Sequence, residues 1–530
     1  MKRKTACVFS VSSIAVCLNL AAVELDRSVM SQAYWDVWND GLQGRIDADI
    51  ERYRQTDATF EVAAPDGAEV KVEQIDHAFF FGAHTFNFNQ LGKKEWNDRY
   101  KALWGTLFNS GTVAFYWRTL EPRPGELRFE ETARDTEEFW NVCKEPWNEP
   151  HWRRPPPEPI IEFLKERGLR IHGHPLVWGN NKWMTPNWLW DEFCPEAEKA
   201  ALEKASGVKV PRWDASLPAG IPCGSIEKEW VRVWKEIYAT LGEEKIAELV
   251  PTYLKAQNEW YARRVREIGE RYGDCVDSWD VVNESAKDYD IFGRKAVRNC
   301  QFDASWYGPM PADYAYKAFT WAQKSLPARA RLNINDYTLG EGMVHQVEDL
   351  AAHGAKIDVV GMQMHLMNPK ESAKIARGEF SKVAYDRAHP DSIRKRFELY
   401  SRLARPVHLS EITITAPDNS TTGQMVQAII LRNLYRLWFS MEKIEGITWW
   451  NVVDNCGAPG EPSISGIFTR DMQPKTAYFA MDDLINGEWK TRLTVKAHEG
   501  NVSFRGFRGR YRLKWIDADG NNQSKTVELK

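Results

Sequence analysis

Cysteine is scarce in this chain of 530 residues, and neither sign of charge is in excess. The eight cysteines form no Cys-x-x-Cys pair, which excludes the common zinc and thioredoxin-type motifs. Lys and Arg number 70 against 74 Asp and Glu, so the chain lacks the basic excess typical of nucleic-acid binders. Glycine (34) and proline (26) are near average, which excludes collagen-like and low-complexity classes. With 43% hydrophobic residues, the chain can bury a large core. Because its charges are balanced, no nucleic-acid partner is expected.

The first residues resemble an export signal. Lys2, Arg3 and Lys4 form a basic start, and a mostly apolar run from Ala6 to Val23 follows. We therefore expect a signal peptide over residues 1–23, a secreted or periplasmic protein, and no membrane association once the signal is removed. No other stretch approaches the ~20 apolar residues of a membrane span. Six cysteines would remain, and a disulfide between Cys194 and Cys223 is compatible with the sequence.

Residues 24–76 and 487–530 differ in pattern from the middle of the chain. Ser31 to Tyr53 has the period of an amphipathic helix, and Thr59 to Glu73 alternates around a Pro-Asp-Gly turn, which predicts a β-hairpin. After Gly487 the helical period is lost, and short alternating runs predict a small β-rich C-terminal appendage.

Between residues 77 and 486, short apolar runs alternate with helical stretches, which is typical of a parallel sheet covered by helices. Eight such runs favour an α/β fold of the (β/α)8 TIM-barrel type. Residues 180–226, rich in proline, are expected to form an irregular insertion. The eight runs are Ala78–His84, Thr112–Trp117, Arg170–Trp178, Val276–Asn283, Arg331–Asn335, Asp358–His365, Pro406–Glu411 and Ile447–Asp454.

Two of these runs end in glutamate, Glu284 after the fourth and Glu411 after the seventh. Active sites of such barrels lie at the C-terminal ends of the strands. Strands four and seven are three positions apart on a ring of eight, so their ends face each other across the mouth. Paired carboxylates across a cleft are what glycosidic bond cleavage requires.

Other strand ends carry groups suited to a polyhydroxylated ring. His172 and His174 lie two apart on the third run, and Gln363 and His365 two apart on the sixth, so each pair shares a face. The fifth run ends in Asn-Asp-Tyr337, and the eighth contains Trp450. Tryptophan is the one composition outlier, with 24 residues, and indoles stack well on sugars.

These motifs, in this order, resemble glycoside hydrolase family 10, the retaining endo-β-1,4-xylanases. The resemblance covers roughly Phe79 to Ala480. Its motifs are Phe81-Gly-Ala, His174-Pro-Leu-Val-Trp178, Trp279-Asp-Val-Val-Asn-Glu284, Asn335-Asp-Tyr337, Gly361-Met-Gln-Met-His365, Ser410-Glu411 and Thr448 to Asp454.

The resemblance implies a role for each matching residue. Glu284 would be the general acid/base and Glu411 the nucleophile, with His365 orienting it and the carboxyls about 5–5.5 Å apart. Asn283 would bind the sugar 2-hydroxyl. The other implied substrate-binding residues are His174, Trp178, Tyr337, Gln363 and Trp450.

The chain also departs from the family pattern. The family's Glu-Asn-x-x-Lys on the second strand is replaced by Thr112 to Trp117, so xylose recognition away from the cleaved bond is in question. Thr413 stands where an Asp usually partners the histidine at His365, so that partner is expected to be missing. Asn451 stands where Gly is usual. We therefore expect a divergent member with an altered cleft.

The leading expectation is a monomeric enzyme that needs no cofactor or metal and cleaves β-1,4-xylosidic bonds in plant cell-wall xylan or a related β-glycan. One alternative is a metal-dependent barrel hydrolase that uses His172 and His174, and chelation would inactivate it. The other is a catalytically impaired barrel that binds carbohydrate without turnover. The sequence leaves open the exact glycan, its branching, endo or exo action and disulfides.

Overall fold

The fold was analysed in a computed structural model that describes residues 24–144, 146, 154–179, 184–211, 224–286, 289, 309–381, 386–458 and 461–530. The expected signal peptide therefore lies outside the described residues, as does Cys223. Within the described ranges, no helix is long and apolar enough to span a membrane.

The central unit is a closed ring of eight parallel strands, which confirms the expected (β/α)8 barrel. The third position is shared by two short segments, and the ring closes where β5 pairs with β7 at His172–Ser278 and Gly173–Trp279. In chain order the strands are β3 (Phe80–His84), β4 (Ser110–Ala114), β5 (Arg170–His174) with β6 (Val177–Trp178), β7 (Ser278–Asn283), β8 (Arg331–Asp336), β9 (Val359–Leu366), β10 (Val407–Ile414) and β11 (Ile444–Trp449). Each overlaps an expected run, because strands buried on both faces are nearly continuous apolar segments.

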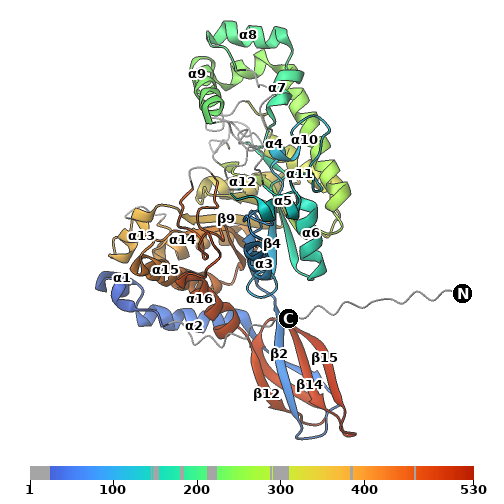
Figure 1. The fold of residues 1–530 in the computed structure, drawn as a ribbon, viewed down its shortest axis with the longest axis vertical. Coiled ribbons are helices and arrows are strands. Elements are labelled where there is room, and N and C mark those ends of the chain that lie inside the picture. Colours follow the sequence, from blue (N-terminus) through green and yellow to red (C-terminus); the bar gives the residue numbers. More distant parts are fainter. Residues whose placement is uncertain are drawn as a thin grey trace, which may run out of the picture.

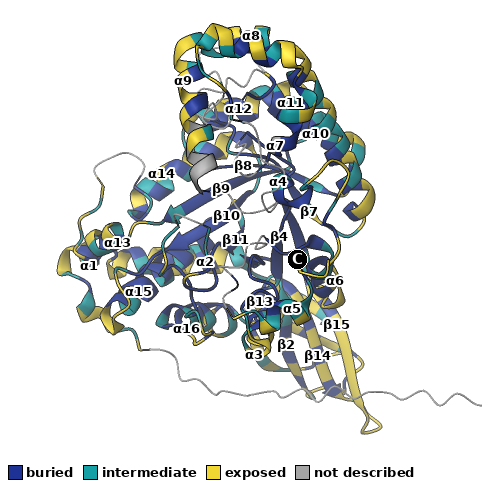
Figure 2. Ribbon diagram, turned by 45° about the horizontal axis from the view of Figure 1, so that its top comes forward, coloured by how far each residue is buried: buried dark blue, intermediate teal, exposed yellow. Residues whose placement is uncertain are grey.

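Helices follow the strands and cover the outside of the ring (Figure 1). The covering helices are α3 (Lys94–Ala102), α6 (Pro157–Glu166), α10 (Pro251–Tyr272), α11 (Tyr314–Ser325), α12 (Glu341–Ala352), α14 (Pro390–Tyr400), α15 (Thr421–Phe439) and α16 (Thr476–Asp482). Their inward faces are buried and their outward faces exposed, as Figure 2 shows for α10.

The insertion expected to be irregular is helical where it is described, so that expectation is wrong. It contains α7 (Asn187–Phe193), α8 (Glu196–Ser206) and the start of α9 (Gly224–Leu249), which with the top of α10 form a lobe above the barrel (Figure 1). Proline suggested irregularity, but Pro195 is the N-cap of α8 and Gly207 ends that helix with φ 73°. The segment between them consists largely of Ala, Glu and Lys, which favour helix. Cys194 in this lobe is a free thiol, and Cys223, the partner that the sequence allows, lies outside the described residues.

Strands from residues 55–77 and 492–529, far apart in the sequence, form one β unit below the barrel (Figure 1). The expected hairpin is wrong: β1 (Gln55–Glu61) and β2 (Glu69–His77) form but do not pair with each other. Strand β1 pairs with β13 (Asn501–Phe507), while β2 lies between β12 (Arg492–Lys496) and β14 (Gly509–Ile516), and β14 pairs with β15 (Asn522–Leu529). The two sheets enclose a separate apolar cluster. The apolar face of β2 is covered by C-terminal strands that no local pattern could reveal.

The lead-in before this unit also differs from expectation. In place of one helix there are two, α1 (Gln32–Val37) and α2 (Asp40–Arg54). The break occurs because the Asn39 side chain accepts the N–H of Leu42 and caps the second helix.

Candidate active site

Strand β10 presents Glu411 at the barrel mouth, next to the end of β9. The residue is 3% exposed, and its Cα partner on β9 is Gln363. The pairing of β10 shifts register on both sides around this point, between His408 and Glu411 against β9 and between Leu409 and Ile412 against β11. Such irregularities re-aim a side chain. Thr413, two residues on, shares the face of Glu411.

Four polar groups surround the Glu411 carboxylate. Asn335 Nδ2 donates to its Oε1 over 2.7 Å, and Gln363 Nε2 donates to the same oxygen over 3.0 Å. His365 Nε2 lies 3.2 Å from Oε2, and His174 Nε2 lies 3.9 Å from Oε1. These groups fix the orientation of the carboxylate in a buried setting.

Glu284 lies directly after β7, is half-buried, and has a left-handed backbone with φ 54°. A non-glycine residue in this region stores strain of about 1 kcal/mol or more, and such strain concentrates at functional sites. Its N–H donates to the carbonyl oxygen of Asn335 over 2.7 Å. The next turn is held by Asp336, whose carboxylate accepts the N–H of Ala286. The end of β8 therefore fixes the backbone that carries Glu284.

One amide nitrogen bridges the two glutamates. Gln363 Nε2 donates to Glu284 Oε1 over 3.2 Å and to Glu411 Oε1 over 3.0 Å. These two oxygens can be no farther apart than the sum of the two distances, which is below the ~6.5 Å lower limit for inverting glycosidases. The geometry therefore favours direct attack by one carboxylate, as in the retaining mechanism.

The expectation that His365 lacks a partner is wrong. Thr413 is its neighbour on β10, and Thr413 Oγ1 lies 2.9 Å from His365 Nδ1. This partner is a neutral hydroxyl, and burial lowers the pKa of His365 to about 3. A neutral imidazole that donates from Nε2 to Glu411 accepts at Nδ1 from the Thr413 hydroxyl.

Burial raises the pKa of Glu411 from 4.5 to about 8. His174 and the hydrogen bond from Asn335 act in the opposite direction, while the charges of Asp280 and Glu461 raise the pKa further. The free site therefore holds the Glu411 proton over an unusually wide pH range.

His172 and His174 both contact Asp280 inside the barrel. Asp280 Oδ2 lies 3.0 Å from His172 Nε2 and 2.8 Å from His174 Nδ1. Burial by itself would raise the pKa of Asp280, but the attraction and hydrogen bonds of the two histidines outweigh it and hold that pKa below its usual range. In the described ranges, no three His, Cys, Asp or Glu side chains are grouped to hold a metal ion. The contacts give this pair a role in orienting buried groups, and they lend no support to the metal-dependent alternative.

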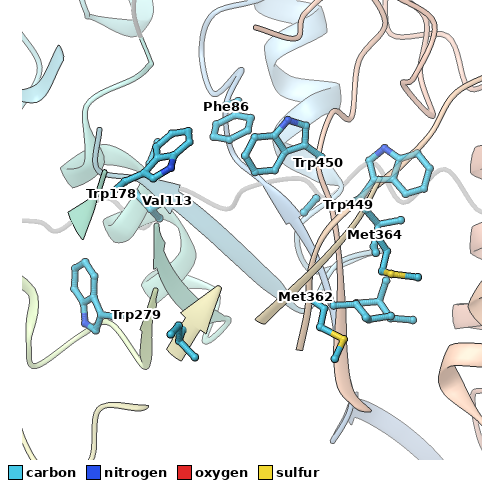
Figure 3. Packing of buried hydrophobic residues seen from close by; sticks show 14 of the residues in the cluster. Phe86, Val113, Trp178, Trp279, Met362, Met364, Trp449 and Trp450 are labelled. Atoms are coloured by element: carbon cyan, nitrogen blue, oxygen red, sulfur yellow. The ribbon is translucent and has the colours of Figure 1, made fainter. Parts of the chain in front are cut away.

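Aromatic side chains lie around the histidines that flank Glu411. The Trp450 ring lies 4.8 Å from Phe86, 5.6 Å from His365 and 5.8 Å from His174, between ring centroids. Figure 3 shows Phe86 beside Trp450, with Trp178 from β6 nearby. Tyr337 lies after β8 at the rim and is 37% exposed. Phe86, Trp178 and Trp450 are buried, so Tyr337 is the one of these four rings that is open to solvent, and flat amphipathic rings of this kind suit a sugar.

Asn283 at the end of β7 has a fixed amide. Its Oδ1 accepts from Asn335 Nδ2 over 2.9 Å and from Gln363 Nε2 over 3.3 Å, so its own Nδ2 is turned away from both. All nine expected site residues are thus described and placed at or beside the mouth, where their individual roles stay predictions.

Sequence reasoning missed several contributors. Asn335 was noted only as a strand end, although it contacts Glu411 and Asn283 and accepts from the hydroxyl of Ser410. Asp280 stands inside the matched Trp-Asp-Val-Val-Asn-Glu motif, which is the signal that could have found it. Glu461, which accepts the indole N–H of Trp450 over 2.9 Å, belongs to a loop with no recognisable pattern.

The central part of this chain is similar in sequence to known proteins. Residues 249–484 match the family described as Glycosyl hydrolase family 10, a range that includes both glutamates. Endo-1,4-beta-xylanase B of Thermotoga neapolitana is 22% identical over 349 residues, which is 64% of this chain and 75% of the relative. Endo-1,4-beta-xylanase B of Paenibacillus barcinonensis is 24% identical over 60% of this chain and 78% of the relative.

Two further similar proteins differ more from this chain. The match covers a smaller part of one of them, and the other has a lower sequence identity. Endo-1,4-beta-xylanase A of a Caldicellulosiruptor species is 22% identical over 61% of this chain but only 38% of its own length. The crystal structure of xylanase B from Clostridium stercorarium F9 superposes with a TM-score of 0.48 at 18% identity, covering 77% of this chain and 97% of that one. In its ordered strand-end motifs and over the matching range, residues 249–484, the central part of the chain is similar to glycoside hydrolase family 10.

Proposed function

We propose that the protein is a retaining glycoside hydrolase that cleaves β-1,4-xylosidic bonds in xylan. The observation that carries this proposal is the single Gln363 nitrogen within hydrogen-bond distance of both glutamates. The matches cover 75% of the relative from Thermotoga neapolitana and 78% of the relative from Paenibacillus barcinonensis. Both relatives are described as endo-1,4-beta-xylanases.

The two carboxyls would act in sequence. Glu284, the more exposed, donates its proton to the leaving glycosidic oxygen while Glu411 attacks the anomeric carbon and forms a glycosyl-enzyme. Glu284, now ionised, then takes a proton from water, and that water displaces Glu411 with net retention of configuration. Asn335, Gln363 and His365 hold the Glu411 carboxylate in line for the first step.

Substitution of each glutamate tests the assignment. Glu411→Gln and Glu284→Gln should each lower kcat/KM on an aryl β-xyloside or xylan by roughly 10²–10⁴-fold or more, while Glu126→Gln, an exposed surface control, should not. Azide should restore turnover to Glu411→Ala and give the inverted α-xylosyl azide, because it attacks from the vacated face. With Glu284→Ala, azide should give the retained β-product. Near-normal activity of both glutamine variants would exclude this mechanism.

The finer aspects of the proposal concern where and on what the enzyme acts. We infer export on the basis of the basic start and apolar run of residues 1–23, and a monomer that works on plant cell-wall polysaccharide. N-terminal sequencing of the protein recovered outside the cytoplasm should begin near residue 24. Light scattering should give the mass of one chain.

A further inference from the structure

We propose that Glu461 is a positioning residue of the candidate active site, which fixes Trp450 beside the histidines that flank Glu411 and places a further carboxylate near Glu411 and His365. The inference deepens the proposed glycosidase function and rests on it for its kinetic tests. Glu461 lies in the loop between β11 and α16, far in sequence from both catalytic candidates.

Both carboxylate oxygens of Glu461 are used. Oε1 accepts the indole N–H of Trp450 over 2.9 Å. Oε2 accepts from Asn451 Nδ2 over 2.7 Å and from the backbone N–H of Ala458 over 3.0 Å. A carboxylate bound by three donors in this way is held in one orientation, and hydrogen bonds to an ionised acceptor are stronger than neutral ones.

The surrounding residues are suited to this arrangement. A Cβ atom at Gly457 would lie 2.6 Å from Glu461 Oε2 and 3.0 Å from Asn451 Nδ2, so glycine leaves room for the pair. The backbone of Trp450 is fixed as well, because its N–H donates to the Ile412 carbonyl over 2.8 Å. With backbone and indole both bound, the Trp450 ring has one position.

In that position the ring lies beside the histidines around Glu411. Trp450 is 7% exposed, and its ring centroid lies 4.2 Å from that of His84, with the His174 and His365 rings within 6 Å. A rotation of the indole would alter contacts with both histidines that flank Glu411. Substrate-positioning side chains of this kind matter because a small misplacement of the reacting groups is costly in rate.

The charge of Glu461 has a second effect. It raises the pKa of Glu411 and that of His365, the latter against the dominant effect of burial. Among the described residues, the charged or titratable groups around Glu411 are His84, Tyr116, His174, Asp280, Glu284, His365 and Glu461. Removal of the negative charge at 461 should therefore lower the pKa of Glu411.

Kinetics of matched variants test the proposal. Glu461→Gln keeps the size of the side chain and removes its charge, Asn451→Gly removes one donor, and Asp471→Asn removes an exposed charge from the same segment as a control. We expect Glu461→Gln to lower kcat/KM by about 10-fold and to move the acidic limb of its pH profile to lower pH. Asn451→Gly should lower kcat/KM by a few fold, and Asp471→Asn should match wild type.

A spectroscopic measurement tests the contact between Glu461 and Trp450 without relying on turnover. The ¹⁵N–¹H indole resonance of Trp450, assigned by its loss in Trp450→Phe, should shift and exchange faster with solvent in Glu461→Gln. An active wild type with unchanged rate, pH profile and indole resonance in Glu461→Gln would overturn the inference and leave the proposed function standing. A wild type inactive on xylosides, with an indole resonance that still depends on Glu461, would instead overturn the proposed function and retain the positioning role.

Discussion

Burial governs the behaviour of Glu411 more than any single neighbour does. The folded state raises the pKa of this carboxyl from 4.5 to about 8, while the unfolded chain keeps the ordinary value. As the pH rises through this window, the unfolded state ionises first and gains stability relative to the folded state. Burial of Glu411 therefore lowers the stability of the folded state above about pH 4.5.

Glu411→Gln should consequently be more stable than wild type, and increasingly so as the pH rises. Below about pH 4.5 both side chains are neutral in the folded and unfolded states, and the free energies of unfolding should be similar. Between about pH 4.5 and 8 the difference should grow, up to roughly 3 kcal/mol near neutral pH. Chemical denaturation of both proteins at pH 4.5, 6 and 7.5 measures this, and a difference that does not change with pH would contradict it.

The contact between Thr413 Oγ1 and His365 Nδ1 offers a second test at the residue scale. Thr413→Val removes the hydroxyl that faces Nδ1, so the imidazole no longer favours the tautomer that donates to Glu411, and kcat/KM should fall by roughly 3- to 10-fold. Thr413→Ser keeps the hydroxyl and should stay near wild type. Thr413→Asp should raise the pKa of His365, so that the protonated ring donates from both nitrogens. Its positive charge should lower the pKa of Glu411 and move the acidic limb of the kcat/KM profile to lower pH. Equal pH profiles for the Val, Ser and Asp variants would show that the contact has no such role.

What the sequence predicts at this scale depends on whether a residue belongs to an ordered motif. Glu284 directly follows the apolar strand β7, Glu411 lies near the end of the apolar strand β10, and both could be found directly. Glu461 could not be found, since nothing local indicates that its loop returns to Trp450. The partner of His365 was misjudged because a neutral hydroxyl was not considered as a substitute for a carboxylate.

At the scale of elements, strands were more predictable than their pairing. The barrel strands are buried on both faces, so each is recognisable by itself. Strands β1 and β2 alternate as half-buried strands do, but their partners lie more than 400 residues away, and proximity in sequence wrongly suggested a hairpin. Helix α8 shows that proline at an N-cap starts a helix as readily as it interrupts one.

Close packing between β8 and β9 offers a test of how elements position the site. A Cβ atom on Gly361 would lie 2.6 Å from Asn335 Oδ1, so Gly361→Ala should displace the Asn335 side chain and weaken its bond to Glu411. We expect kcat/KM to fall by about 10-fold. Gly44→Ala in the exposed face of α2, with nothing within 4 Å, should keep full activity and gain up to about 1 kcal/mol. Wild-type activity in Gly361→Ala would show that Asn335 has room to adjust.

At the scale of the whole molecule, the β unit closes the chain on itself at the N-terminal ends of the barrel strands, opposite the candidate site (Figure 1). Trp489 links it to the barrel, because its ring stacks on Phe439 at 4.1 Å and on Phe81 at 5.7 Å between centroids. The unit also has its own core, to which Val70 and Val72 contribute from one end of the chain and Tyr511 and Leu513 from the other.

Truncation at residue 491 should therefore harm the protein by leaving half of this unit without its partner. Strand β2 would lose both neighbours, and its apolar face and open edges would favour aggregation. The matched control also replaces residues 55–77 with a short Gly-Ser linker. This linker is feasible because the backbone of Arg508 bonds both Arg54 and Ala78. We expect the single truncation to be insoluble and the double deletion to yield soluble protein that retains activity, since the carboxylates lie at the far end of the barrel. Soluble yield, melting temperature and kcat/KM measure this, and a single truncation as soluble and stable as the full chain would contradict it.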